Sequence, residues 1–474
     1  MQKEPQLSEA KQRLLDLQKR SALIRTGSVS EVEGCVREIP TPLSLAQEQV
    51  WRLDQIAAKI APLHHESITI HRHGPCDPAL VETCLAEIVR RHEIWRTTFE
   101  VVDGKPVQVV HPPFKVKLAT SDLSNLPECE RDDKALQLAT QDAKQSFDLA
   151  SGPLFRARLV TLDDNQHRLY LTAHQMIVDG ITVFDIFPSE LTALYENFSA
   201  GKPSPFPDLR SQYADFACWQ RRSIVETKKQ QLAYWQKQLA GALPVLRWPN
   251  QGMRPRQPYR GALQPFTLSQ RLCEQLRDLA RSEGVTLFMV LLSAWAILLH
   301  RYTHQEDIII GTLAPSGRKR IEFQRLMGYF LNPVALRVNL IGNPDFSSLL
   351  AQVRQLTLAA ISHDDIPIEL IADSLQVTPE PGRHPFFNVA LSVSPDVPPL
   401  PPGWSMTYMD VESGGARWDL YVEMNDRPEG MIGRAQYNPD LFTATTITQT
   451  LEDFLSLLEK LVAAPSQSIA ELAG

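Results

Sequence analysis

The residues of this chain that could do chemistry together lie in LTAHQMIVDG, residues 171–180. His174 ends a run that alternates like a β-strand, and Asp179 and Gly180 follow just before a helix-like segment. Ligands and reacting groups are common where a strand opens toward the start of a helix. Asp179 could pair with an arginine and hold the turn, and Gly180 would let backbone or substrate approach closely.

A plainer interpretation competes with this one. A lone histidine on a strand is more often a satisfied core residue than a catalytic group, and His-x4-Asp-Gly is a weak pattern by itself. Gln175 also stands next to the histidine, where an active site would be expected to carry a second ionisable group. The stretch is therefore an active site, an active site with one part replaced, or the end of a core strand.

Composition excludes several classes of protein. The chain has 474 residues, 43% hydrophobic and 22% charged, which is ordinary for globular proteins and long enough for two lobes. A net charge of -7 argues against a nucleic-acid binder, and the densest basic run, SGRKR at 316–320, is expected to be a solvated loop. The six cysteines are scattered without CxxC or zinc-ligand spacing, so we expect a reduced, cytoplasmic protein with no metal site.

The sequence does not predict a membrane protein. The N-terminal MQKEPQLSEAKQRLLDL is charged and lacks the apolar core of a signal peptide. The apolar run VTLFMVLLSAWAILL at 285–299 would reach about 22 Å as a helix, whereas a bilayer core needs about 30 Å. We expect this run to be a buried core helix.

The elements that must position the motif mix helices and strands, often as hairpins, which predicts α/β or α+β lobes built on mixed sheets. Asp103-Gly104 predicts a hairpin over 97–110, and DDNQ predicts a turn between two strands within 154–174. Pro188 marks a kink or a fresh start in a helix over 182–198. Apolar periodicity predicts further helices over 78–93, 130–147, 269–283, 285–302, 346–362 and 443–463, and strands near 307–313, 334–341, 386–394, 417–424 and 431–437.

Two irregular stretches separate the expected lobes. A proline-rich loop at 201–209 and a long connection at 243–261 interrupt the periodic segments. We expect a leader at 1–36 that is a linker or a docking segment, an N-terminal lobe at 37–218 and a C-terminal lobe at 219–474.

Seven stretches in order resemble the condensation domains of non-ribosomal peptide synthetases and hybrid polyketide–peptide synthetases, relatives of chloramphenicol acetyltransferase. The core motif of that family is His-His-x-x-x-Asp-Gly, and here it stands as HQMIVDG at 174–180. Each motif is modest evidence alone, but seven in order, spanning about 38–463, are strong evidence. The other similar stretches are SLAQEQVW (44–51), RHEIWRTTF (91–99), YADFACWQ (213–220), MGYFLNPVALR (327–337), HDDIPIELI (363–371) and RHPFFNVALS (383–392), and ARWDLYVEM (416–424) looks like the family's Phe-Asp-Leu strand.

The resemblance implies two acyltransferase-like lobes in a V-shaped pseudo-dimer with a central tunnel. Donor and acceptor carrier proteins would dock at opposite mouths, each with a thioester on 4'-phosphopantetheine, and the acceptor amine would attack the donor thioester. It implies no intrinsically bound cofactor. Its partners would be peptidyl or acyl carrier proteins and other synthetase modules, with no nucleic acid and no membrane.

The family's residue roles carry over to matching positions only. The second His of the motif is assigned to proton abstraction or amine positioning, and the Asp is largely structural. The implied site consists of His174, Gln175, Asp179 and Gly180 in the catalytic motif, Asn332 and Trp418 in the substrate tunnel, and Arg96 and Asp419 as structural support.

Some assignments stay open at this point. The arginine partner of Asp179 is Arg96, Arg256 or Arg260. Trp418 fits the tunnel and the core equally well.

Three other features have plain explanations. Tyr213 and Trp219 are expected in packing rather than in substrate contact. LHHESI at 63–68 holds a true His-His pair, but no Asp-Gly follows it, so we expect it to lie outside the site.

Gln175 departs from the family pattern and changes the expected chemistry. A positioned general base contributes about 10²–10⁴-fold, and glutamine cannot act as one, although its carbonyl oxygen can orient an amine. A free α-amine has a pKa of about 7.7–8.0, and good positioning supplies roughly 7–11 kcal/mol, so amide formation can survive the loss. Ester formation and epimerisation depend more on a base and are disfavoured, and His174 argues against the cyclising relatives.

Two hypotheses follow. In the first, the domain is an active amide-forming condensation domain in which Gln175 orients the amine. In the second, it is a catalytically degenerate domain that binds a carrier protein and gates a pathway or recruits a tailoring enzyme. Asp179, Gly180 and Asn332 are intact together with the flanking motifs, which favours the first.

Overall fold

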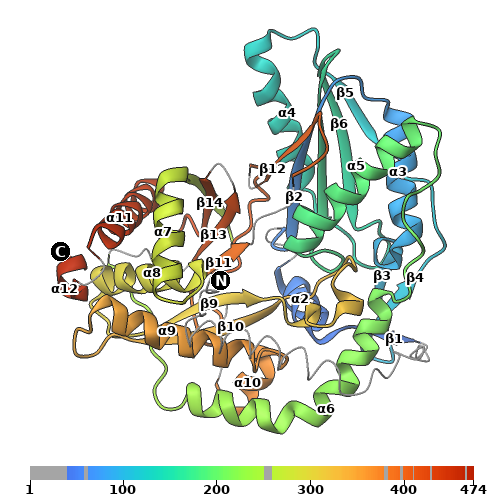
Figure 1. Ribbon diagram of the computed structural model, residues 1–474. Helices are drawn as coiled ribbons and strands as arrows, with labels where there is room; N and C mark the ends of the chain where they lie inside the picture. Colours follow the sequence, from blue (N-terminus) through green and yellow to red (C-terminus); the bar gives the residue numbers. More distant parts are fainter. Residues whose placement is uncertain are drawn as a thin grey trace, which may run out of the picture.

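The computed structural model gathers helices and strands into two lobes inclined to each other (Figure 1). Elements from the first half of the chain form the N-terminal lobe, and the yellow to red elements form most of the C-terminal lobe. The expected mixed α/β fold class is confirmed, while the expected leader at 1–36 lies outside the described residues. The structure describes residues 40–57, 62–249, 259–377, 383–394, 399–408, 410–427, 430–464 and 467–473.

The N-terminal lobe is built on a five-stranded sheet in the order β12-β2-β7-β6-β5. Its central strands pair antiparallel, with His65 directly opposite His174. Alternation along β6 separates the two faces, because Leu159 packs with α3 and α5 whereas Val160 packs with α4. The bounds are β2 (His65–His73), β5 (Ala119–Asp122), β6 (Phe155–Asp163), β7 (Gln166–His174), β12 (Trp404–Tyr408), α3 (Pro78–Arg91), α4 (Glu128–Ala143) and α5 (Phe187–Ser199).

A small sheet in the order β1-β4-β3 lies below the N-terminal lobe. The predicted hairpin over 97–110 is confirmed, and Asp103 and Gly104 both have positive φ, as a tight turn of this kind requires. The bounds are β1 (Thr41–Pro42), α2 (Leu45–Ala57), η1 (Glu93–Arg96), β3 (Thr97–Val102) and β4 (Lys105–Val110).

The helix predicted over 182–198 begins twice. A π-helical turn, η2 (Thr182–Ile186), precedes α5, whose first turn carries Pro188. Proline is accepted in a first helical turn because its missing N–H has no intrahelical partner there. Pro188 therefore marks a fresh start, which is one of the two expected alternatives.

The C-terminal lobe is built on a six-stranded sheet in the order β10-β9-β11-β13-β14-β8. β11 runs parallel to β9 and β13, and the other pairs are antiparallel. The bounds are β8 (Ala262–Ser269), β9 (Asp307–Ala314), β10 (Asn332–Asn339), β11 (Val389–Ser394), β13 (Leu420–Arg427), β14 (Gly430–Tyr437), η3 (Ser316–Arg318), η4 (Ile321–Phe323), α7 (Gln270–Ser282), α8 (Leu287–Thr303), α9 (Phe346–Ile361), α10 (Ile368–Ser374), α11 (Ala444–Ala463) and α12 (Ile469–Ala473).

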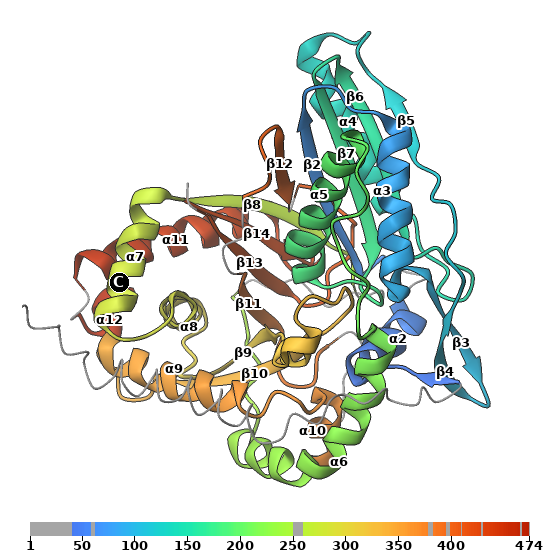
Figure 2. The ribbon, with the colours of Figure 1, turned by 45° about the vertical axis from the view of Figure 1, so that its right-hand side comes forward.

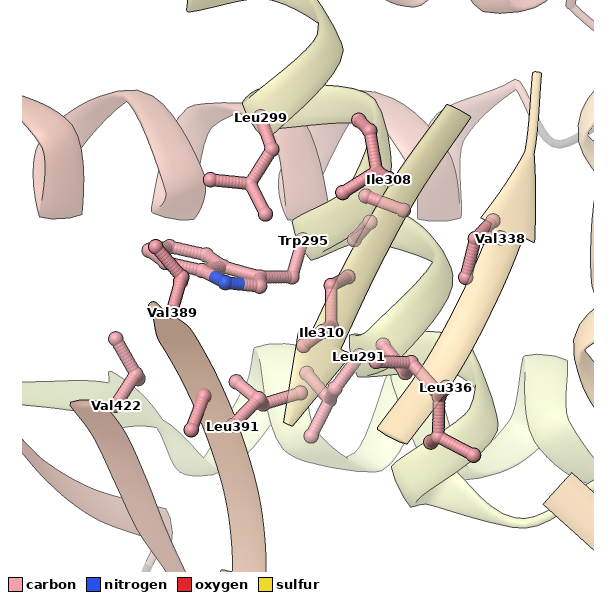
Figure 3. Packing of buried hydrophobic residues seen from close by; sticks show 14 of the residues in the cluster. Leu291, Trp295, Leu299, Ile308, Ile310, Leu336, Val338, Val389, Leu391 and Val422 are labelled. Atoms are coloured by element: carbon pink, nitrogen blue, oxygen red, sulfur yellow. The ribbon is translucent and has the colours of Figure 1, made fainter. Parts of the chain in front are cut away.

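The core of this lobe is centred on α8, the helix predicted over 285–302. Its residues 289–299 are all buried, and Trp295 packs toward the strands that carry Ile310 and Leu391 (Figure 3). The expectation of a buried core helix is confirmed. Within the described residues no single helix has the length and apolarity to cross a bilayer; α7 and α8 pass that test only as a pair, which is bent by 103°.

The lobes are joined by more than one segment. The long helix α6 (Tyr213–Gln238) runs along the bottom of Figure 1 from one lobe toward the other, and the expected boundary at 218/219 falls inside it. β12, from the second half of the chain, adds a strand to the N-terminal sheet beside β2 (Figure 2). The hydrophobic core of the N-terminal lobe also takes Phe323, Tyr329 and Phe330 from the second half. The chain therefore does not divide cleanly at one residue.

Candidate active site

A cavity of about 140 Å³ lies between the lobes. From the N-terminal lobe it is lined by β2 and by the turn that follows β7, and from the C-terminal lobe by residues of all the sheet's strands except β10. Gln175, Asp179, Gly180 and Trp418 line it. Strand pairing and lobe packing thus bring four of the eight implied site residues to one cavity.

Asp179 is the most completely bonded group of the motif. Its Oδ1 accepts hydrogen bonds from Arg318 Nη2 at 2.8 Å and from the backbone N–H and Oγ1 of Thr182 at 2.7 and 2.8 Å. Its Oδ2 accepts from Arg318 Nε at 3.1 Å and from the backbone N–H of Phe330 at 3.3 Å. The carboxylate therefore fixes the turn after β7 to the segment that crosses from the C-terminal half.

The arginine partner is none of the three expected ones. Arg96 donates to the backbone carbonyl of His111, Arg260 pairs with Asp440, and Arg256 lies outside the described residues. Arg318 fills the role instead.

Arg318 belongs to the run SGRKR, and the expectation of a solvated loop was wrong for it. Arg318 is only 6% exposed, and its Nη1 donates to the backbone carbonyls of Leu326 and Gln324 at 2.8 and 3.0 Å. A buried guanidinium is tolerated when a carboxylate and carbonyls satisfy its donors. A run of basic letters gives no sign of such partners, because they come from residues 139 positions earlier and from a later turn.

His174 is buried behind the cavity wall, not in it. Its Nδ1 accepts a hydrogen bond from the backbone N–H of Met176 at 3.1 Å, and its Nε2 lies 3.3 Å from Asp54 Oδ1. Asp54 also lies 3.6 Å from Nδ1 of His64. Burial opposes ionisation of Asp54, but its hydrogen bonds to these two histidines lower its pKa overall.

Asp54, His64 and His174 have the residue types of a metal site, with candidate ligand atoms within 4.8 Å of one another. The hydrogen bonds of His174 argue against a metal there. Because Nδ1 accepts from Met176, the ring proton must be on Nε2, where it is donated to Asp54. A metal would need the lone pair of that nitrogen. The cluster therefore fits a hydrogen-bonded support for the strand end.

The His-His pair expected outside the site lies in it. The rings of His64 and His65 have their centroids 5.9 and 5.7 Å from that of His174, and His65 lines the cavity. The expectation was wrong because it required an Asp-Gly nearby in sequence. Pairing of β2 with β7 supplies the proximity instead.

Gln175 is turned toward a buried ionic cluster. Its Nε2 donates to Glu66 Oε1 at 2.7 Å, and Glu66 lies 3.6 Å from Arg434, which also pairs with Glu423 at 2.8 Å. Burial raises the pKa of Glu66, while the Arg434 guanidinium favours the ionised form. The Gln175 Oε1 is buried and has no hydrogen-bond partner in the described part of the chain. The glutamine therefore keeps an unused acceptor, and its amide nitrogen is held by Glu66.

Gly180 is not required by the backbone. A Cβ at this position would meet only the ring of Phe184, at 3.6 Å, which is an ordinary contact. Since Gly180 lines the cavity, a side chain there would take space from a ligand instead.

The two implied tunnel residues differ in position. Trp418 lines the cavity and also packs against Phe387 and Tyr421, with centroids 5.7 and 5.0 Å apart, so both expected alternatives hold. Asn332 is buried away from it and is not among its lining residues in the described chain. Its Nδ2 donates to the backbone carbonyls of Asp364 and Ile366 at 2.8 and 2.7 Å.

The remaining implied residues contact other parts of the scaffold. Asp419 accepts from Asn388 Nδ2 at 2.9 Å at the start of β13. Tyr213 is buried and donates to the backbone carbonyl of Tyr329, and the Trp219 ring packs 5.3 Å from that of Phe323, so both are packing residues as expected.

Comparison with known proteins places this geometry in a family. The family model described as "Condensation domain" matches residues 38–473. A protein of the linear gramicidin synthase of Brevibacillus parabrevis is 38% identical over 443 residues, which are 92% of this chain and 9% of that protein. Phosphinothricin tripeptide synthetase PhsC of Streptomyces viridochromogenes is 35% identical over 441 residues, 91% of this chain and 40% of that protein. The chain thus spans less than half the length of either relative.

Solved structures agree on the fold. The X-domain from teicoplanin biosynthesis matches with a TM-score of 0.80 and 26% identity, covering 93% of this chain and 98% of that one. The first condensation domain of the calcium-dependent antibiotic synthetase, in complex with a substrate analogue, matches with a TM-score of 0.81 and 20% identity, covering 92% and 99%. With the motif cavity between two lobes and a family model that covers nearly all of it, the chain belongs to the condensation domains of non-ribosomal peptide synthetases.

Proposed function

We propose that this domain forms amide bonds between two carrier-bound substrates. The acceptor amine attacks the carbonyl carbon of the donor thioester, the C–N bond forms, and the C–S bond breaks. The amine proton ends on the departing sulfur, so the products are an amide on the acceptor carrier and a free phosphopantetheine thiol on the donor carrier. The domain needs no cofactor of its own for this exchange.

The observation that carries the proposal is the intact cavity between the lobes. Asp179 and Arg318 are fully bonded across the lobes, and Gly180 leaves space beside them. Both lobes contribute lining residues, as two substrates arriving from opposite sides require. Only position 175 of the motif departs from the family pattern.

The loss of the second His does not abolish this chemistry. The missing base would contribute about 10²–10⁴-fold, which is about 3–5 kcal/mol at the transition state. Holding a neutral amine against a thioester supplies roughly 7–11 kcal/mol in favourable cases. Positioning therefore outweighs the loss for an amine, whereas a hydroxyl acceptor depends more on a base.

The test is transfer between carriers followed by intact mass. A donor carrier with an acyl or aminoacyl thioester and an acceptor carrier with an aminoacyl thioester are mixed with the native protein, Gln175→His or Gln175→Ala. We expect the native protein to move the acyl mass to the acceptor carrier. The proposal is wrong if the native protein transfers nothing with any carrier pair and Gln175→His does.

A second candidate function rests on one structural neighbour. The complex of the X-domain and OxyB from teicoplanin biosynthesis matches with a TM-score of 0.77 and 25% identity. By analogy, this domain would bind a carrier and gate the pathway or recruit a tailoring enzyme without forming a bond. Binding of a loaded carrier by native protein, with no transfer by the native protein or by Gln175→His, would favour this candidate.

A further inference from the structure

His65 is the one histidine beside the motif that reaches the cavity. It lies opposite His174 in the β2–β7 ladder and lines the same cavity as Gln175. His174 has both ring nitrogens engaged, with Met176 and Asp54. His64 is fully buried beside Asp54. A ring nitrogen for substrate contact is therefore available only from His65 among these three.

The hydrogen bonds of His65 fix which nitrogen that is. Nδ1 lies 2.8 Å from the backbone carbonyl oxygen of Ala143. A carbonyl can only accept, so Nδ1 carries the proton and Nε2 carries the lone pair. Within the described residues Nε2 has no hydrogen-bond partner. The ring is thus held as an acceptor.

The surroundings hold the ring in place and keep it unprotonated. The edge of Phe147 packs at 4.8 Å between centroids, and the Arg156 guanidinium lies 3.9 Å from the Phe147 ring. Burial, with help from the nearby His174 and Arg156, lowers the pKa of His65 to about 3. At neutral pH the Nε2 lone pair is therefore free.

Gln175 cannot fill this role as well as His65. Its amide nitrogen is bonded to Glu66, and its oxygen is buried. The second ring nitrogen of the family motif is thus missing at position 175, while another ring nitrogen faces the same cavity from the neighbouring strand.

We propose that His65 Nε2 accepts a hydrogen bond from the attacking amine and so takes over the positioning task of the missing motif histidine. This inference rests on the proposed amide-forming function. The hydrogen bond aims the nitrogen lone pair at the thioester carbon. As the C–N bond forms and the C–S bond breaks, the amine proton passes to the sulfur, and His65 ends the cycle unchanged.

The test places His65→Phe in two backgrounds, native and Gln175→His. The readout is the single-turnover transfer rate at saturating loaded carriers, with carrier affinity and unfolding midpoint measured beside it. We expect His65→Phe to slow the native protein about 100-fold or more, the scale of one acid–base or positioning group. In the Gln175→His background the same change should cost less than about threefold, because the motif histidine takes the amine back.

His71→Phe is the matched control, since His71 lies on the same strand and bonds Thr407 outside the cavity. Should His65→Phe unfold, His65→Asn makes the same comparison with a smaller side chain. Equal losses in both backgrounds, or no loss in either, would overturn the inference while transfer by the native protein stands. No transfer by the native protein would remove the proposed function and this inference with it.

Discussion

The two ends of the motif HQMIVDG are bonded very differently. At the Asp179 end, both carboxylate oxygens are occupied by Arg318, Thr182 and Phe330. At the Gln175 end, Gln175 Oε1 and the nearby His65 Nε2 have no partner in the described chain. A polar group whose bonds are complete holds the scaffold, whereas unpaired acceptors beside a cavity are left for a ligand.

The largest predicted effect breaks the bonded end. Arg318→Met leaves Asp179 as an uncompensated buried charge, and we expect a loss of about 3–5 kcal/mol in the free energy of unfolding. Urea denaturation measures it. Arg325→Met is the control, because Arg325 pairs with Asp185 at the surface and should cost under about 1 kcal/mol. Similar losses in both variants would contradict the structural role of Arg318.

A second change blocks the open end without touching the scaffold. Gly180→Val adds atoms where the backbone has room but the cavity does not. We expect transfer to slow about 100-fold, the cost of misplacing reacting groups by about 1 Å, with the unfolding midpoint little changed. Gly180→Ala should have a smaller effect. Normal transfer by Gly180→Val would show that substrates do not pass this residue.

Glu66 sharpens the comparison because it connects the open end to a bonded cluster. In Glu66→Gln the charge that holds the Gln175 amide is gone, and we expect transfer to slow about tenfold, the cost of one charge-assisted hydrogen bond. Single-turnover rates of Glu66→Gln, Gln175→Ala and the double variant form a cycle. Effects that simply add would mean that the two side chains act independently.

The smallest effect is a pH dependence of stability from His64. Burial, with the nearby charges of Arg417 and His174, lowers its pKa from 6.5 to about 4, so below pH 6.5 the unfolded chain takes a proton that the folded protein refuses. Its contribution to stability is present above pH 6.5 and falls as the pH drops toward 4. Between pH 6.5 and 5.5 the native protein should lose about 1 kcal/mol more than His64→Leu does. Parallel stability curves for the two proteins would contradict this.

Local sequence patterns predicted the elements that local physics controls. The turn at Asp103-Gly104, the β6–β7 pair and the buried helix α8 follow from turn chemistry, alternation and apolar length. β2 was not predicted, because polar residues such as His65 and Glu66 face the cavity and break its apolar alternation. β12 was not predicted either, since it is a short strand that joins the sheet of the other lobe.

The candidate site was only partly predictable for the same reason. Asp179 and Gly180 carry a family pattern that can be recognised within seven residues. Arg318, His65 and Asp54 reach the site through contacts spanning about 110 to 140 positions, and their neighbours in sequence carry no sign of it. Strand pairing and lobe packing decide those contacts.

The most direct test of amide formation without a motif base is the pH dependence of single-turnover transfer by the native protein. No enzyme group has to lose a proton near neutral pH in this account, so the rate should rise with the neutral fraction of the acceptor amine. For a free α-amine the midpoint would lie near its pKa of about 7.7–8.0. Replacing the acceptor by an amine of different pKa should move the midpoint with it. A midpoint that stays fixed when the amine changes, or the absence of transfer at every pH, would contradict the account.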